Sequence, residues 1–137
     1  MSYGTSAALQ AAVYQHLLAD PGVAALVGGA VFDALPAGVK PETYVTLGAE
    51  EVRDQSDASG GAAEHRIAIS VVTTADGFAT AKAVAGAVSD ALIDAELTLA
   101  RGRLVGLWFH RASARRAGQA GQARRIDLRF RARVEDD

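Results

Sequence analysis

Arginine is the chemically versatile residue type that is most strongly concentrated in one part of this sequence. Ten arginines fall between residues 101 and 133, where Asp127 is the one acidic residue, so this segment has a local net charge of +9. Residues 1 to 100 carry twelve acids against four bases, a local sum of −8. Guanidinium groups bind carboxylates and phosphates through paired hydrogen bonds. The charge separation therefore predicts either a basic face for an anionic partner or two complementary faces.

The last arginines alternate with apolar residues, as in a strand with one buried face. Ile126, Leu128, Phe130, Ala132 and Val134 point one way, and Arg125, Asp127, Arg129, Arg131 and Arg133 point the other way. Like charges on one strand face repel each other. We therefore expect acidic partners nearby, from Glu50, Glu51 and Glu64 or from another subunit.

A nucleic-acid site is the alternative use of these arginines, with Arg111, Arg115, Arg116 and Arg124 beside the final turn able to neutralise phosphates. Such a site also needs aromatic rings that stack on bases. Trp108 and Phe109 are adjacent in a strand and point to opposite faces, which leaves at most one of them exposed. An intersubunit or cross-strand role is favoured.

The other chemistry-bearing residues lack the patterns that enzymes and metal sites require. His16, His65 and His110 have no ligand-like spacing, and the chain contains no cysteine. The acids Glu50, Glu51, Asp54 and Asp57 match no calcium-loop pattern and indicate a solvated acidic hairpin. We therefore expect no catalytic residues, no metal and no cofactor; a small hydrolase or transferase has no supporting motif.

Hydrophobic periodicity predicts the elements that position these residues. Helices are expected at residues 6–19, 23–27 and 78–95, the second begun by Asp20 and Pro21. Strands are expected at 44–52, 66–73 and 103–112, with a last strand through 134 and a short extended piece at 31–32. Val45, Leu47 and Ala49 should face inward, and residues 53–63 should form a long hairpin connection or a mobile arm.

This order of elements predicts one α+β domain over residues 1–137. An antiparallel sheet of about four main strands should carry the N-terminal helix and the long central helix on one face. No apolar run approaches the roughly 20 residues that span a bilayer, so no membrane partner is expected. The N-terminal residues do not resemble a signal peptide, so synthesis in the cytoplasm is expected.

The succession of elements resembles the phage tail terminator, or tail completion, family, including the versions in gene transfer agents. The matching segments cover nearly the whole chain: ALQAAVYQHLLADPGVAALVGGAVFDALP, PETYVTLGAEEVRDQSD, HRIAISVVTTADGFATAKAVAGAVSDAL and LVGLWFHRASARR with the final arginine-rich strand. The resemblance lies in element order and apolar positions, without a catalytic signature.

The resemblance implies a structural virion protein that forms a ring, a hexamer, at the head-proximal end of a tail tube. This ring would end tube polymerisation and join the head–tail connector protein, with DNA passing through the lumen unread. The implied partners are other copies of the chain, the tail tube protein and the connector. Arg125, Arg129, Arg131, Arg133, Glu50 and Glu51 would contact a neighbouring subunit or the tail, and the hairpin residues Arg53, Asp54, Gln55, Ser56 and Asp57 would reach the lumen or a neighbouring ring.

Two alternatives remain open at this stage. One is a nucleic-acid-binding module that uses the C-terminal arginine-rich hairpin. The other is a neighbouring virion role, either as a different head–tail connector or as a minor tail protein.

Overall fold

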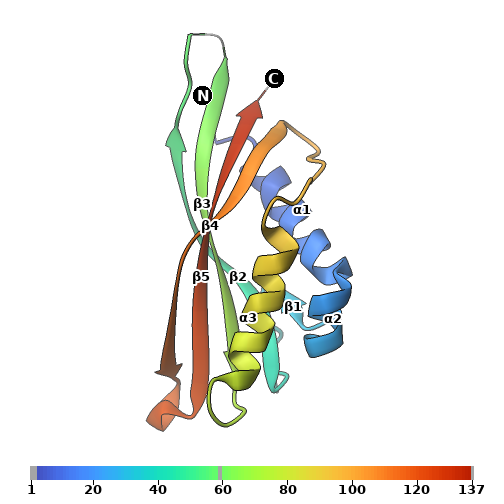
Figure 1. Cartoon of the computed structure of the whole chain (residues 1–137), viewed down its shortest axis with the longest axis vertical. Coiled ribbons are helices and arrows are strands. Elements are labelled where there is room, and N and C mark those ends of the chain that lie inside the picture. The colour runs from blue at the N-terminus through green and yellow to red at the C-terminus, as the bar shows by residue number, and fades with distance from the viewer. Residues whose placement is uncertain (1–2, 59, 137) are drawn as a thin grey trace.

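The computed structural model describes residues 3–58 and 60–136, which contain helical elements and one sheet (Figure 1). The helices are α1 (Ser6–Ala19), α2 (Pro21–Val27), α3 (Ala79–Leu92) and the short 3-10 turn η1 (Gln119–Gly121). The strands are β1 (Val31–Phe32), β2 (Thr43–Asp54), β3 (Gly61–Thr73), β4 (Arg103–Ala117) and β5 (Ala123–Asp136). The predicted α+β fold is confirmed.

The five strands form one sheet in the order β1-β2-β3-β5-β4. Antiparallel pairing joins β2 to β3, β3 to β5 and β4 to β5, while the short edge strand β1 pairs with β2 in parallel. The sheet therefore has one strand more than the four expected, and it is mixed because β1 reaches the sheet edge from the helical segment before it.

The helices α1, α2 and α3 cover one face of the sheet (Figure 1). Leu9, Val13 and Leu17 of α1 are fully buried against this face. From β5 the core receives the alternating apolar residues that the sequence predicted, namely Ile126, Leu128, Phe130, Ala132 and Val134. The opposite face of β5 consequently carries the arginines away from the helices.

A β-bulge in β2 changes which residues face the helices. Leu47 pairs with Ile69 but Glu50 pairs with Ile67, so Gly48 and Ala49 of β2 together lie opposite Ala68 of β3. The extra residue reverses the alternation beyond this point. The prediction that Ala49 faces inward is wrong because Ala49 is exposed, and Glu50 takes the helix-facing position instead.

Beyond the bulge, β2 and β3 continue as a hairpin arm, which we define as residues 50–65. The arm extends past the helices at the upper end of the molecule (Figure 1). Both ends of the predicted connection 53–63 are paired strand, because β2 reaches Asp54 and β3 begins at Gly61, and an isolated bridge joins Asp57 to Gly60. The backbone amide of Gln55 donates a hydrogen bond to the Ala62 carbonyl at 2.8 Å. Buried Ala62 and Ala63 also pair with β5, which extends the sheet along the arm.

The edge strand β4 is longer than predicted and is covered less than a core strand. It reaches Ala117 and contains two register shifts. Trp108 and Phe109 do point to opposite faces, but both are 44% exposed. The prediction that at most one is exposed is wrong, because Trp108 lies on the uncovered face of the sheet and Phe109 lies on an edge strand that the helix layer covers only in part.

Candidate assembly surface

The sheet face opposite the helices gathers arginines from three neighbouring strands. We call this surface the arginine face and define it by Arg66 of β3, Arg111 and Arg115 of β4, and Arg125, Arg129, Arg131 and Arg133 of β5. Residues directly opposite each other in an antiparallel pair share a face, so the register alone places these side chains together. The four predicted arginines of β5 are therefore one row of a wider cationic surface.

Three pairs of arginines lie directly opposite each other on this face. Arg66 is opposite Arg131 in the β3–β5 pair. In the β4–β5 pair, Arg111 is opposite Arg129 and Arg115 is opposite Arg125. Like charges at opposing positions destabilise a sheet. The isolated subunit therefore carries electrostatic repulsion on this face that its fold does not require.

Asp127 neutralises one end of the arginine face. Its carboxylate accepts hydrogen bonds from Ser70 Oγ at 2.6 Å and Arg125 Nε at 2.9 Å, and Arg115 lies 3.7 Å away. Burial raises the pKa of Asp127, but the hydrogen bonds from Ser70 and Arg125 and the charges of Arg125 and Arg115 lower that pKa overall. The Arg115–Arg125 pair is thus compensated, whereas Arg111 and Arg129 form no ion pair among the described residues.

The arm supplies acids and an amide at the other end of the face. Glu64 pairs with Arg66 at 2.7 Å and accepts a hydrogen bond from Gln55 Nε2 at 3.3 Å. Gln55 Oε1 in turn accepts from Arg133 at 3.0 Å. The exposed Glu51 pairs with Arg53 at 3.2 Å. The predicted proximity of Glu64 and Glu51 to arginines is therefore present in the structure, although their main partners are Arg66 and Arg53.

Glu50 lies on the helix-facing side and does not join the arginine face. Its carboxylate accepts hydrogen bonds from the Tyr3 and Ser6 hydroxyls at 2.6 Å each, and lies 3.1 Å from His65 Nδ1. His65 is fully buried, and its Nε2 is 3.3 Å from the Thr5 hydroxyl. Burial raises the pKa of Glu50, but the hydrogen bonds from Ser6, Tyr3 and His65 lower that pKa below its ordinary value. Glu50 therefore fastens the N-terminal segment to the base of the arm.

The tip of the arm is held by short-range hydrogen bonds that the side chains of Asp54 and Asp57 accept. Asp54 accepts hydrogen bonds from the Ser56 hydroxyl at 2.5 Å and from the Ser56 amide at 3.1 Å. Asp57 accepts from the Gly60 amide at 3.1 Å. These contacts place the predicted hairpin residues Arg53, Asp54, Gln55, Ser56 and Asp57 in one exposed group at the tip.

Sequence reasoning missed Arg66 and Trp108 as members of this surface. Arg66 alternates with the inward Ile67, a signal that places it on the outer face, but its pairing with Arg131 depends on strand register. Trp108 is likewise opposite Arg131 in β4. Strand order β3-β5-β4 was the missing information, because sequence neighbours alone do not place β5 between β3 and β4.

Within residues 3–58 and 60–136, no cluster of three or more histidines and carboxylates is arranged to hold a metal ion. No helix in the described part of the chain is long and apolar enough to cross a membrane.

Residues 11–135 match the model of the family described as tail completion protein gp17. The chain belongs to this tail completion family. It is consequently a structural tail protein of a virion. A chain in the solved structure titled "Virion of native gene transfer agent (GTA) particle" is 63% identical, with a TM-score of 0.92 over 98% of this chain and 99% of that chain. None of the curated proteins matches the sequence.

Proposed function

We propose that this tail completion protein forms a ring of six copies at the head-proximal end of a tail tube. The ring ends tube polymerisation, joins the tail to the head connector and lets DNA pass through its lumen without sequence recognition. The particle is of the gene transfer agent type, as is the source of the 63% identical chain. Family membership supports a role in completing the tail, and the arginine face supplies the assembly surface.

The observation that carries the proposal is the set of opposed arginines. Arg111 and Arg129 lie opposite each other without an ion pair among the described residues, so they repel each other in the free subunit. Glu64 partly offsets the same repulsion between Arg66 and Arg131. Acidic groups of a neighbouring subunit or of the tail tube protein would relieve that repulsion on assembly. Charge complementarity also suppresses wrong partners and accelerates encounter. We therefore assign Arg125, Arg129, Arg131 and Arg133 to the subunit or tail interface.

The acids of the arm complete the proposed assignment. Glu51 is exposed and is available to a neighbour, whereas Glu50 contributes by holding Tyr3 and Ser6 at the base of the arm. The tip from Arg53 to Asp57 extends past the helices and contacts the lumen or a neighbouring ring. An arm fixed at its base by a buried contact can hold its tip at a set distance from the subunit body.

Electron microscopy of assembled particles tests the proposed position. We expect density for this chain as one ring between the tail tube and the head connector, and particles lacking the chain should have unjoined tails of uncontrolled length. Density along the tube or at the host-proximal tip would contradict the proposal. Density inside the connector would instead assign the chain to the connector itself.

Nucleic-acid binding is the second candidate, and the exposed Trp108 favours it. Trp108 lies opposite Arg131 on the arginine face, so an aromatic surface and cationic groups occur together. A salt-dependent mobility shift of generic duplex DNA at micromolar protein would support this candidate. DNA binding by free subunits that is lost on ring assembly would show that the arginine face serves assembly in the particle.

A further inference from the structure

An apolar groove lies between α3 and β4, on the helix side of the sheet. Its volume is about 340 Å³, and its walls include Ala85 and Gly86 of α3 and Phe109, Ala112 and Ala114 of β4. The groove exists because Ala85 and Val88 of α3 pack into the core while β4, the last strand of the sheet, extends beyond the helix. An open apolar hollow is an unfavourable surface for a subunit in water.

Two details show that the subunit leaves this groove unfilled. A side-chain carbon placed on Gly86 would meet no atom within 4 Å, so the glycine is not needed for packing inside the subunit. Phe109 packs edge-on against Phe130 with ring centroids 5.9 Å apart, yet it stays 44% exposed. A partner surface with small side chains could enter beside α3 and cover the Phe109 ring.

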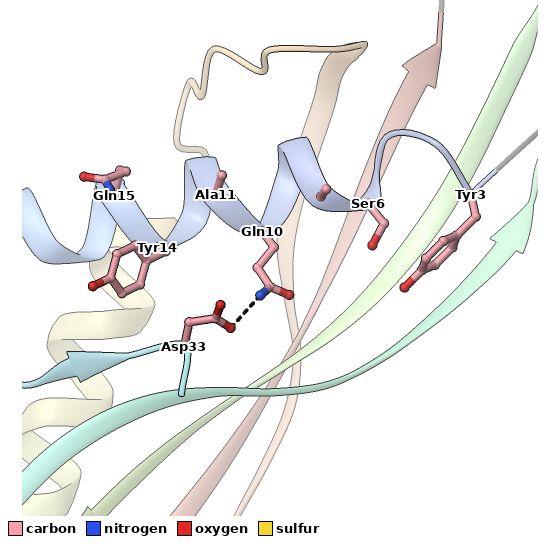
Figure 2. Close-up of a pocket in the computed structure, with 8 residues that line it drawn as sticks. Tyr3, Ser6, Gln10, Ala11, Tyr14, Gln15 and Asp33 are labelled. Atoms are coloured by element: carbon pink, nitrogen blue, oxygen red, sulfur yellow. Dashed lines mark hydrogen bonds between the residues drawn. The ribbon is translucent and has the colours of Figure 1, made fainter. Parts of the chain in front are cut away.

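The opposite edge of the molecule presents such a surface. Helix α1 has no acidic residue, lysine or arginine in its 14 residues, although Ala7 and Ala11 are exposed. Figure 2 shows the outward side of α1 beside Asp33, whose carboxylate accepts a hydrogen bond from Gln10 at 2.6 Å. Leu26 of α2 and Leu35 in the segment after β1 are also exposed.

The charges of the two edges are complementary. Before Lys40 the sequence contains the acids Asp20 and Asp33 but no lysine or arginine. On the helix side of the sheet, Lys82 lies on the groove wall, and Arg116 of β4 lies opposite Arg124 of β5. The α1 edge is therefore apolar with a negative border, and the groove is apolar with a positive border. Matching apolar centres with opposite charged borders favour contact between the two edges.

We propose that the groove binds a second copy of this chain through the outward face of its α1 helix. This inference rests on the ring function proposed above and names the contact that forms the ring. Because β1 and β4 are opposite edges of the sheet, each copy can present α1 to one neighbour and the groove to another. A contact between two different patches propagates from copy to copy and closes when the rotation allows it.

Filling the groove tests the proposal with a matched control on the same helix. Gly86→Leu should leave folding intact, because the site is open and leucine favours a helix more than glycine does. It should reduce self-association by about tenfold or more, measured by light scattering after size-exclusion chromatography. Ala83→Leu adds an apolar side chain on the solvent side of α3, outside the groove, and should assemble like the unmodified protein.

Cross-linking identifies the occupant of the groove, because the chain has no cysteine of its own. A protein with Ala11→Cys and Ala112→Cys, treated with a flexible bis-maleimide, should give a ladder of covalent oligomers that ends at the ring size. Replacing Ala112→Cys by Ala83→Cys should abolish the ladder. Equal ladders from both pairs, or no ladder from the groove pair in assembled protein, would overturn the proposal.

The outcomes separate this contact from the ring function. If the unmodified chain forms rings and Gly86→Leu forms them equally well, the groove contact is wrong and the ring proposal stands. If the unmodified chain stays monomeric even with tail tube protein, the ring proposal itself fails.

Discussion

The contact between Glu50 and His65 shows how a polar pair becomes useful when it is buried. Neither residue belongs to a catalytic or metal-binding pattern, and the acids of this segment were expected to be solvated. The bulge in β2 instead turns Glu50 toward α1, where Tyr3, Ser6 and His65 surround its carboxylate. The pair therefore stabilises the junction between the N-terminal segment and the arm.

Glu50→Gln should lower the free energy of unfolding at pH 7 by about 1–2 kcal/mol, because an amide replaces a carboxylate that accepts hydrogen bonds from several donors. The pKa of Glu50 is lowered in the folded state, so its contribution is present above the ordinary value of 4.5 and is lost as the pH falls through the folded-state pKa. Denaturant unfolding at several pH values should show a weaker loss of stability in acid for Glu50→Gln.

The neighbouring carboxylate provides the control for this measurement. Glu51 forms an exposed ion pair with Arg53, and such pairs contribute roughly 0–1 kcal/mol. Glu51→Gln should therefore keep the acid dependence of the unmodified protein. The same acid dependence in all three proteins would show that Glu50 is not a source of it.

At the scale of elements, the spacing of apolar residues predicted the helices and strands that depend only on their own sequence. The stripe of Leu9, Val13 and Leu17 defines α1, and strict alternation defines β5. The bulge after Leu47 and the parallel partner of β1 were beyond such reasoning, because both depend on how distant strands pair. The same limit hid the arginine pairs, since the register of β3 and β4 against β5 creates them.

The start of α2 is an element boundary that a single residue, Asp20, predicted correctly. Asp20 was expected to cap this helix, and its carboxylate does accept the Val23 amide at 3.0 Å. Asp20→Ala should lower the free energy of unfolding by about 1 kcal/mol, since it leaves a helix-end amide without its side-chain acceptor. Thermal unfolding measures the change. Asp20→Asn retains an acceptor oxygen and should lose less stability; equal losses would assign the effect to charge.

At the scale of the whole molecule, the separation of charge along the sequence becomes a separation between surfaces. The arginine-rich segment supplies the sheet face opposite the helices, together with the β4 edge. The first 39 residues supply an edge without lysine or arginine. A near-neutral chain thus presents unlike surfaces in different directions, which suits a subunit that contacts several different neighbours.

The arginine face gives the clearest test of assembly at this scale. Arg129→Gln with Arg131→Gln should leave the free energy of unfolding within about 0.5 kcal/mol or raise it, because Arg111 and Arg66 lose a repelling neighbour. Assembly with tail tube protein should weaken by about tenfold or more and should depend less on salt. Sedimentation velocity at two salt concentrations measures the assembled fraction.

Substituting a second pair of arginines distinguishes an effect of where the charges lie from an effect of the total net charge. Arg101 pairs with Asp136 and Arg103 with Glu135, so their charges are already neutralised within the subunit. Arg101→Gln with Arg103→Gln changes the net charge by the same amount but leaves the arginine face intact. If assembly depends on that face, this control should assemble normally. Equal weakening of both double variants would mean that net charge alone drives the association and would remove Arg129 and Arg131 from the interface.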